Sequence, residues 1–248
     1  MAGHSKWHNI RIRKEKQDAQ RGKIFTRIAR EIIVAARNGG GDPEMNPSLR
    51  VAVEKAREAN MPADTIKRNI QRGTGELEGV SYEQVSYEGY GPAGIAVIVT
   101  CLTENRNRTV ADVRHVFSKH GGNMSEPGSV TWQFRSVGLI SVDAQALPED
   151  RMVELAMEAG AEDLSTEDGV YEITTAPEDL HKVQCALEAA GVKVQGSELT
   201  LTPTNVVAVS EADAPAVMRF MDALEDLDDV QNVYANFDIP DEVMAKLG

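Results

Sequence analysis

The chain has 248 residues, 42% of them hydrophobic, and a formal net charge of −13 at pH 7. The apolar content is sufficient for folded cores and excludes an intrinsically disordered chain, and the length suits two or three domains. Aromatic residues make up only 5% of the chain, which argues against a surface built mainly from side chains that stack on bases.

Cysteine usage and hydropathy indicate the compartment. Cys101 and Cys185 are the only cysteines, and two thiols so far apart indicate a reducing environment and no metal cluster. The N-terminus is basic, but no apolar run follows it, so the sequence predicts no secretory signal. No stretch approaches the length of a membrane-spanning helix. We therefore expect a cytoplasmic protein that makes no contact with a membrane.

Charge is divided unevenly along the chain. Residues 1–72 carry 16 Lys/Arg against 8 Asp/Glu (net +8), whereas residues 73–248 carry 10 against 31 (net −21). Because the Debye length in cell-like salt is about 8 Å, the two parts present separate fields. The basic part requires an anionic partner and the acidic part repels the same partner. Nucleic acid is the first partner that this pattern predicts.

A helix is predicted over residues 23–37. Apolar residues recur at helical spacing and form one face: Phe25, Ile28, Ile32, Ala35 and Ala36. Basic residues three to seven positions apart form a stripe on the opposite face: Lys23, Arg27, Arg30 and Arg37. An exposed row of like charges is mildly destabilising, and only Glu31 is close enough in sequence to neutralise it, so we expect an anion to bind there.

Two further helices complete a basic helical head. The glycines at 39–41 end the first helix, and Asn46 followed by Pro47 predicts the N-cap and first turn of the second. Pro62 begins the third helix, and Gly73 is predicted to end it. A linker is expected over residues 73–81.

The remainder alternates strands and helices. Strands at 95–102 and 129–134 flank a helix at 109–120, and a strand–helix–strand–strand–helix–strand unit occupies 138–202. The unit at 82–134 supplies only half of a ferredoxin-like fold, and the tail (strand 205–209, helix 213–227, strand 230–237) supplies the rest. The predicted fold class is therefore α+β: a three-helix N-terminal domain followed by two ferredoxin-like α/β domains, the third inserted into the second. The expected domains are 1–75, 80–135 with 205–240, and 136–204.

The N-terminal arm, residues 1–20, interleaves basic side chains with one tryptophan. Lysine and arginine neutralise phosphates and release counterions, and Trp7 can stack on a base. A solvated, flexible terminus is the alternative. The basic helix that follows favours binding, and the candidate nucleic-acid-binding residues are His4, Lys6, Trp7, Arg11, Arg13, Lys14, Lys16, Arg21, Lys23, Arg27, Arg30, Arg106 and Arg108.

Arg106 and Arg108 belong to a segment between a predicted strand and a predicted helix. Thr109 is expected to cap that helix, with Asp112 as its partner. A helix N-terminus attracts phosphate, and the two arginines would reinforce that attraction. Alternatively the arginines pair with Glu104 or Asp112, and the sequence leaves both interpretations open.

The remaining motifs predict no chemistry. The G-x-G-x-x-G at residues 89–94 precedes a strand and contains Pro92, so it is interpreted as a loop and not as a dinucleotide site. His4 and His8 have no further ligands, and no catalytic motif is present. The acidic run at 225–229 is interpreted as a solvated helix end. We expect no enzyme activity, no cofactor and no metal.

Ten short segments stand out when the sequence is taken as a whole. They are Ala2-Gly3-His4-Ser5-Lys6-Trp7, Gln17-Asp18, Arg21-Gly22-Lys23-Ile24-Phe25, Gly39-Gly40-Gly41-Asp42-Pro43, Asn46-Pro47, Asn60-Met61-Pro62, Tyr87-Glu88-Gly89-Tyr90-Gly91-Pro92, Asn105-Arg106-Asn107-Arg108-Thr109, Gly121-Gly122-Asn123 and Gly128-Ser129-Val130. Together they resemble one protein family, YebC/PmpR, which includes mitochondrial translational activators of cytochrome oxidase. Ser125-Glu126-Pro127 departs from the glycine-containing turn common in the family. The resemblance implies a helical N-terminal domain, two α/β domains and a cytoplasmic regulator of gene expression.

Three functions are compatible with this sequence. A DNA-binding transcriptional regulator would use the basic helix on a duplex, although no clear helix-turn-helix is present. A ribosome- or ribosomal-RNA-binding translation factor that relieves stalling would use the flexible arm and its tryptophan. A protein-binding adaptor would use the acidic α/β domains. The expected partners are therefore DNA, ribosomal RNA or both, with protein partners as the third alternative.

Overall fold

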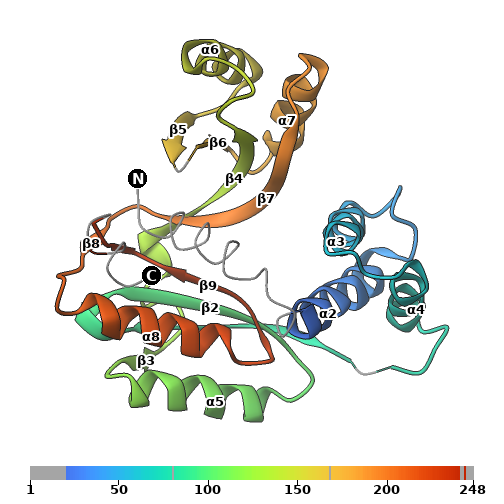
Figure 1. The fold of residues 1–248 in the computed structure, drawn as a ribbon. Coiled ribbons are helices and arrows are strands. Elements are labelled where there is room, and N and C mark those ends of the chain that lie inside the picture. Colours follow the sequence, from blue (N-terminus) through green and yellow to red (C-terminus); the bar gives the residue numbers. More distant parts are fainter. Residues whose placement is uncertain (1–20, 80, 168, 241–242, 244–248) are drawn as a thin grey trace.

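The structure, a computed structural model, describes residues 21–79, 81–167, 169–240 and 243. The elements form a helical unit, a host sheet unit and an inserted sheet unit that interrupts the host, each with its own apolar core (Figure 1). The predicted α+β class, with a helical part followed by two sheet parts, is confirmed. We propose that the three units are separate domains at the limits that the sequence predicts.

The helical unit contains α2 (Arg21–Gly39), α3 (Pro47–Glu58) and α4 (Ala63–Thr74). Asn46 caps α3 as predicted, because its side-chain oxygen accepts a hydrogen bond from the backbone N–H of Leu49 at 3.1 Å. Its amide also donates to the carbonyls of Ala35 and Gly40, each at 2.8 Å. One buried side chain therefore fixes both the start of α3 and the end of α2.

The predicted end of α4 at Gly73 is wrong. Gly73 is buried inside the helix, and α4 ends at Gly75, whose φ of 82° is the left-handed cap. A Cβ at Gly73 would lie 2.6 Å from the Cβ of Ala36 and 2.6 Å from the carbonyl oxygen of Ile33. The glycine is therefore required for the close approach of α4 to α2.

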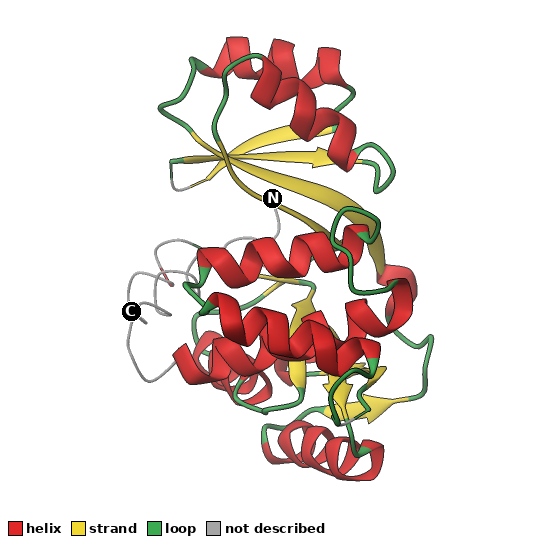
Figure 2. Ribbon diagram, turned by 90° about the vertical axis from the view of Figure 1, so that its right-hand side faces the viewer, coloured by secondary structure: helices red, strands yellow, loops and turns green. Residues whose placement is uncertain are grey.

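The host unit is an antiparallel sheet with α5 and α8 on one face (Figures 1 and 2). Its elements are β1 (Glu83–Tyr90), η1 (Pro92–Gly94), β2 (Ala96–Thr103), α5 (Arg106–Lys119), β3 (Asn123–Ser125), α8 (Ala214–Glu225) and β9 (Val230–Ala235). The strand order is β3-β1-β2-β9, so the β1–β2 hairpin lies at the centre. The two helices meet through Phe117 and Phe220, whose rings are edge-to-face at 5.0 Å. The sheet order confirms that the tail completes this unit.

The short strands β8 (Val207–Ala208) and β10 (Phe237–Asp238) pair separately, in parallel.

Two differences from the predicted elements have one cause, the buried carboxylate of Glu88. The sequence did not predict β1, and the strand predicted at 129–134 is wrong, because η2 (Thr131–Gln133) occupies half of it and Phe134 already belongs to the next strand. Glu88 projects from β1 and accepts backbone hydrogen bonds from Gly128, Val130 and Thr131 at 2.8–3.0 Å. The carboxylate therefore holds residues 128–131 as a turn. In β1 the same glutamate occupies a buried position, so the alternation of apolar and polar residues that predicts a strand is interrupted there.

The inserted unit has the βαββαβ connectivity and the strand order β5-β6-β4-β7 of a ferredoxin-like fold. Helices α6 and α7 cover one face of its sheet (Figure 1). Its elements are β4 (Phe134–Asp143), α6 (Glu149–Ala159), β5 (Asp163–Glu167), β6 (Val170–Thr175), α7 (Leu180–Ala189) and β7 (Val194–Pro203). The predicted element order over 138–202 is confirmed.

A buried polar contact joins the host and inserted units where the chain crosses between them. The side-chain oxygen of Gln133 accepts from the amides of Asn236 at 3.1 Å and Asn205 at 3.3 Å, and its backbone carbonyl accepts from the N–H of Thr204 at 2.7 Å. Asn236 also accepts from the N–H of Ala96 at 2.7 Å. The start and end of the insertion are therefore fixed to the same edge of the host.

We predict that Gly73→Ala destabilises the protein by about 1–3 kcal/mol, because the new methyl group would meet the backbone of α2. Gly22→Ala is the matched control, since that helical glycine has nothing within 4 Å of its Cβ position. We expect the control to be neutral or to stabilise by about 0.5–1 kcal/mol. Urea unfolding of both variants tests this, and equal stabilities would contradict it.

Candidate nucleic-acid interface

The basic stripe of α2 lies against the acidic turn, which we define as residues 225–229 between α8 and β9. Lys23 Nζ is 2.8 Å from Asp226 Oδ1 and donates to the carbonyl of the same residue at 3.3 Å. Arg27 donates to the carbonyl of Glu225. These carbonyls lie at the C-terminal end of α8, where the helix dipole is negative. Cations that the sequence assigned to phosphate therefore contact an anionic segment of the same chain.

Arg30 makes the innermost contact of this stripe. Its side chain is 11% exposed and lies 3.2 Å from the carboxylate of Asp229, which is 7% exposed. It also donates to the carbonyl of Asp228, and its guanidinium carbon is 5.4 Å from the ring centroid of Tyr82. The contact between the helical unit and the host thus contains a buried ion pair.

Asp229 binds the beginning of α5 as well. Arg108 donates to its two carboxylate oxygens at 2.9 and 3.2 Å, and the Thr109 hydroxyl donates at 2.7 Å. Burial by itself raises the pKa of Asp229, but the hydrogen bonds from Thr109 and Arg108 and the charge of Arg30 together lower it below its usual range. One ionised carboxylate therefore joins α2, α5 and the acidic turn, and we call this set of contacts the clasp.

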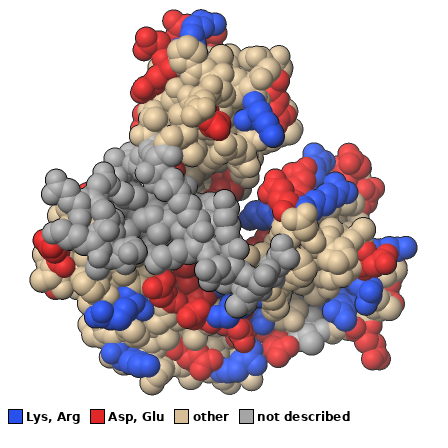
Figure 3. Space-filling model, in the orientation of Figure 1, with Lys and Arg blue, Asp and Glu red and all other residues tan. Residues whose placement is uncertain are grey.

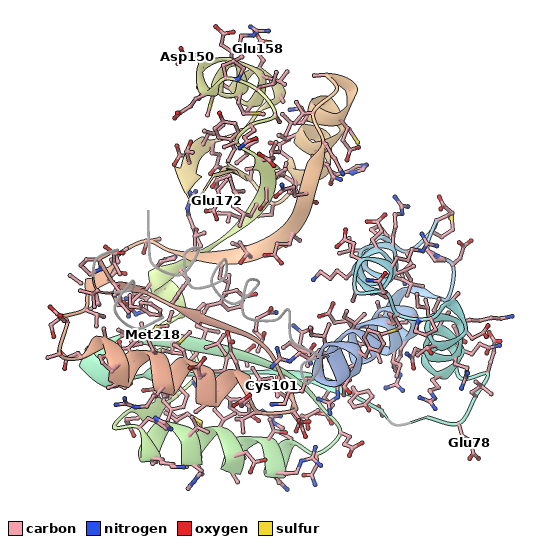
Figure 4. All side chains as sticks on the ribbon, in the orientation of Figure 1. Glu78, Cys101, Asp150, Glu158, Glu172 and Met218 are labelled. Carbon is pink, nitrogen blue, oxygen red and sulfur yellow. The ribbon has the colours of Figure 1, made fainter. Side chains whose placement is uncertain are left out.

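Cys101 lies beside the clasp, near the end of β2 (Figure 4). Burial, with a further contribution from the charge of Asp229 and an opposing one from Arg30, raises the pKa of its thiol to about 12. Such a thiol is protonated at physiological pH and is a poor nucleophile. Cys185 is exposed on α7, so the two cysteines occupy opposite environments.

The clasp corrects one interpretation made from the sequence. The acidic run at 225–229 is not a solvated helix end, because Asp229 is buried and ion-paired. The α2 cations that contact this run are about 200 residues away in the chain, so no local spacing reveals the contact. Glu31, the acidic residue nearest to the stripe in sequence, lies 3.7 Å from Lys55 of α3.

The segment before α5 also differs from the prediction. Asn105, not Thr109, caps the helix, because its side chain accepts from the N–H of Arg108 at 3.1 Å. Arg108 pairs with Glu104 at 3.6 Å as well as with Asp229. Arg106 is exposed at the first position of α5. The ion-paired alternative thus describes Arg108, whereas Arg106 faces solvent.

The predicted arm residues lie outside the described residues: His4, Lys6, Trp7, Arg11, Arg13, Lys14 and Lys16. The side chain of Arg21 also lies outside them, although its backbone begins the described part of α2. The roles of these residues in binding nucleic acid stay a prediction.

An unpredicted basic surface lies on α4, on the side that faces away from α2. Lys67, Arg68 and Arg72 are exposed there, opposite the buried Ile66 and Gly73. The ion pairs found among the described residues include none of these three cations. Basic side chains are visible over the helical unit in Figure 3. The signal in the sequence was present, because these positions share the polar face of a helix whose apolar face the sequence predicts.

Other site chemistry finds no support in the part of the chain that the structure describes. Gly89 belongs to β1, the motif ends with η1, and strand β2 follows, so no α-helix follows the glycines as a dinucleotide site requires. No group of three or more His, Cys, Asp or Glu side chains that could hold a metal ion occurs within residues 21–79, 81–167, 169–240 and 243. Among those same residues, no helix has the length and hydropathy needed to span a membrane.

Comparisons with known proteins match nearly the whole chain. The family description "TACO1/YebC protein N-terminal domain" matches residues 5–76, and "TACO1/YebC second and third domain" matches residues 82–237. A "Probable transcriptional regulatory protein" of Acidithiobacillus ferrooxidans is 58% identical over 247 residues, which cover 100% of this chain and 98% of that protein. A protein of the same name from Persephonella marina is 55% identical over 249 residues, with 100% of both chains covered. The crystal structure of a conserved hypothetical protein from Aquifex aeolicus is 49% identical, with a TM-score of 0.84 and coverage of 92% of this chain and 94% of that one.

We predict that Asp229→Asn destabilises the protein by about 3 kcal/mol at pH 7, because the buried charge of Arg30 would lose its anionic partner. The pKa of Asp229 is depressed in the folded state, so its contribution is present above its unfolded pKa of about 4 and is lost as the pH falls through the folded value. The difference from the wild type should therefore narrow at acid pH.

Urea unfolding over a range of pH values measures this difference. Asp226→Asn is the control, because its ion pair with Lys23 is exposed and is expected to contribute less than about 1 kcal/mol. A wild-type stability at pH 7 in the Asp229→Asn protein would show that the clasp does not hold the structure together.

Proposed function

The chain belongs to the TACO1/YebC family, and on this basis we propose that it is a nucleic-acid-binding regulator of gene expression, with DNA as its first candidate partner. Its curated relatives carry the name probable transcriptional regulatory protein, which supports regulation as the function. We propose that the basic helical domain makes the contact, and that the protein acts by binding and not by catalysis.

The observation that carries this proposal is the exposed basic face of α4. Lys67, Arg68 and Arg72 are exposed on the face of α4 opposite the face that packs on α2, so a polyanion can reach them from solvent. Surface cations neutralise phosphates and release counterions, which gives affinity with little dependence on sequence. The arm, with Lys6, Arg11 and its other basic residues, adds to the same positive field.

The α2 stripe has a different role in this proposal. Lys23, Arg27 and Arg30 hold the helical domain against the acidic turn of the host. We therefore do not count them among the proposed phosphate contacts. The proposed contacts are the arm, α4 and the exposed Arg106. About six phosphate contacts would give a slope near −5 for log K against log salt on duplex DNA.

We predict that replacing Lys67, Arg68 and Arg72 together with Ala lowers the magnitude of this slope by about two to three, since each lost phosphate contact removes about 0.9. The same measurement on a Lys6, Arg11, Arg13 and Lys14 to Ala variant reports the contribution of the arm. Fluorescence anisotropy with a labelled duplex at several salt concentrations gives both slopes.

The matched control removes the same charge elsewhere. Arg135, Arg151 and Lys182 lie in the inserted unit, and each pairs with an acidic side chain there. Their combined replacement with Ala should leave the slope unchanged. Equal slopes for the wild type, the α4 variant and the arm variant would contradict binding through the helical domain.

A ribosome- or ribosomal-RNA-binding translation factor is the second candidate, and Trp132 favours it. Its side chain is 70% exposed, and its indole N–H donates to the carbonyl of Ser129 at 3.0 Å. Glu88 holds the same turn through three backbone N–H groups. An exposed ring on a rigid turn, with its polar group already bonded, is suited to stack on an unpaired base.

We predict that Trp132→Ala weakens binding to a ribosomal RNA fragment with unpaired bases by about 5- to 150-fold, which corresponds to one base stacked at about 1–3 kcal/mol. Duplex DNA, which has no unstacked bases, should bind as before. Trp132→Phe keeps an aromatic face and should retain most of the affinity. Wild-type affinity of the Trp132→Ala protein for the RNA would exclude base stacking by this ring and remove the observation that favours the second candidate.

A further inference from the structure

The lysines and arginines of residues 73–248 are concentrated on α5 and α8, the two helices of the host unit. Residues 73–248 contain ten Lys/Arg, the remainder of 26 after the 16 of residues 1–72. Five of these ten lie on the two helices that cover the host sheet: Arg106, Arg108, Arg114, Lys119 and Arg219. The acidic part of the chain is therefore not uniformly repulsive toward an anion.

Most of these cations form no ion pair with another residue in the described part of the chain. Arg108 belongs to the clasp, but the ion pairs formed within the described part of the chain do not involve Arg114, Lys119 or Arg219. All three are exposed. By contrast, Arg135 of the inserted unit lies 2.7 Å from Glu162.

The packing of α5 on α8 brings Lys119 and Arg219 close together, while Arg114 is exposed on the same helix as Lys119. Phe117 and Phe220 are in edge-to-face contact at 5.0 Å, and the ring of His120 lies 6.2 Å from that of Phe220. Lys119 follows Phe117 by two residues, and Arg219 precedes Phe220 by one, so both emerge beside this contact.

The pKa of His120 supports the placement of Lys119 and Arg219 beside this contact. Burial lowers the pKa of His120, and the charges of Lys119, Arg219 and His115 lower it further, so these groups are close enough to repel a proton on the imidazole. Basic side chains are visible over α8 and α5 at the lower left of Figure 3. Asp112 and Asp222 lie on the same two helices, so the layer as a whole carries both signs of charge.

We infer that Arg114, Lys119 and Arg219 form a second phosphate-binding surface on the outer face of α5 and α8. It would contact the backbone of the nucleic acid that the helical domain binds, and so it rests on the function proposed above. The chemistry that it recognises is the phosphodiester, because the surface offers charge and hydrogen-bond donors, whereas neither of these two helices carries an exposed Phe, Tyr or Trp. The molecule would then have two separate basic contacts, one on α4 and one on the host.

Replacing Arg114, Lys119 and Arg219 together with Ala tests the surface. We expect the salt slope of duplex binding to fall in magnitude by about two to three, with the folded structure retained because all three side chains are exposed. The Arg135, Arg151 and Lys182 variant is again the control of equal charge. A slope equal to that of the wild type overturns the inference while binding through the helical domain stands. No binding by the wild-type protein overturns both.

A crosslinking experiment locates the contact independently. In a Cys185→Ser background the buried Cys101 is the one native thiol left, and its raised pKa keeps it unreactive. Ser118→Cys, exposed between Phe117 and Lys119, can then carry a photoreactive group, with Val153→Cys on α6 as the control position. We expect duplex DNA to crosslink at 118 and not at 153. Equal yields at both positions would overturn the inference.

Discussion

The carboxylate of Asp229 is the contact on which the arrangement of the helical and host units depends. It is buried between the guanidinium groups of Arg30 and Arg108 and accepts a hydrogen bond from Thr109. A buried carboxylate is tolerated only when it is paired and accepts hydrogen bonds, so the three segments must stay together for Asp229 to remain ionised. Hydrogen bonds and ion pairs are directional, so this contact fixes the orientation of the helical unit on the host more strictly than apolar packing, which is non-directional.

The clasp also changes how the uneven charge of the chain is understood. The net charge of +8 over residues 1–72 does not describe what a partner meets, because part of it faces the acidic turn. Exposed cations that form no ion pair with another described residue include Lys67, Arg68 and Arg72 on α4 and Arg114, Lys119 and Arg219 on the host helices. Charge counted along a sequence therefore predicts the class of partner, whereas the folded chain decides which surface the partner reaches.

The sequence predicted those features that depend on local spacing. Asn46 as an N-cap, the order of elements in the inserted unit and the return of the tail to complete the host follow from periodicity and from turn residues. The missed features depend on buried polar contacts between distant segments. Glu88 converts a predicted strand into a turn, and Asp229 recruits arginines from two other segments. The basic face of α4 was missed for another reason, since helical spacing predicts a polar face there but does not distinguish a binding surface from a solvated one.

The junction between the host and inserted units has a consequence for the evolution of this chain. Phe134 and Pro203 are direct partners in the pairing of β4 with β7, so the insertion leaves the host and returns to it at neighbouring positions. Closing a loop costs little additional entropy as its length grows, and here its two ends are already held together. An ancestral hairpin at this position could therefore have acquired or exchanged a complete folded module without disturbing the sheet that received it. The host is in this sense a platform, because β3, β1, β2 and β9 pair with one another without any strand of the inserted module.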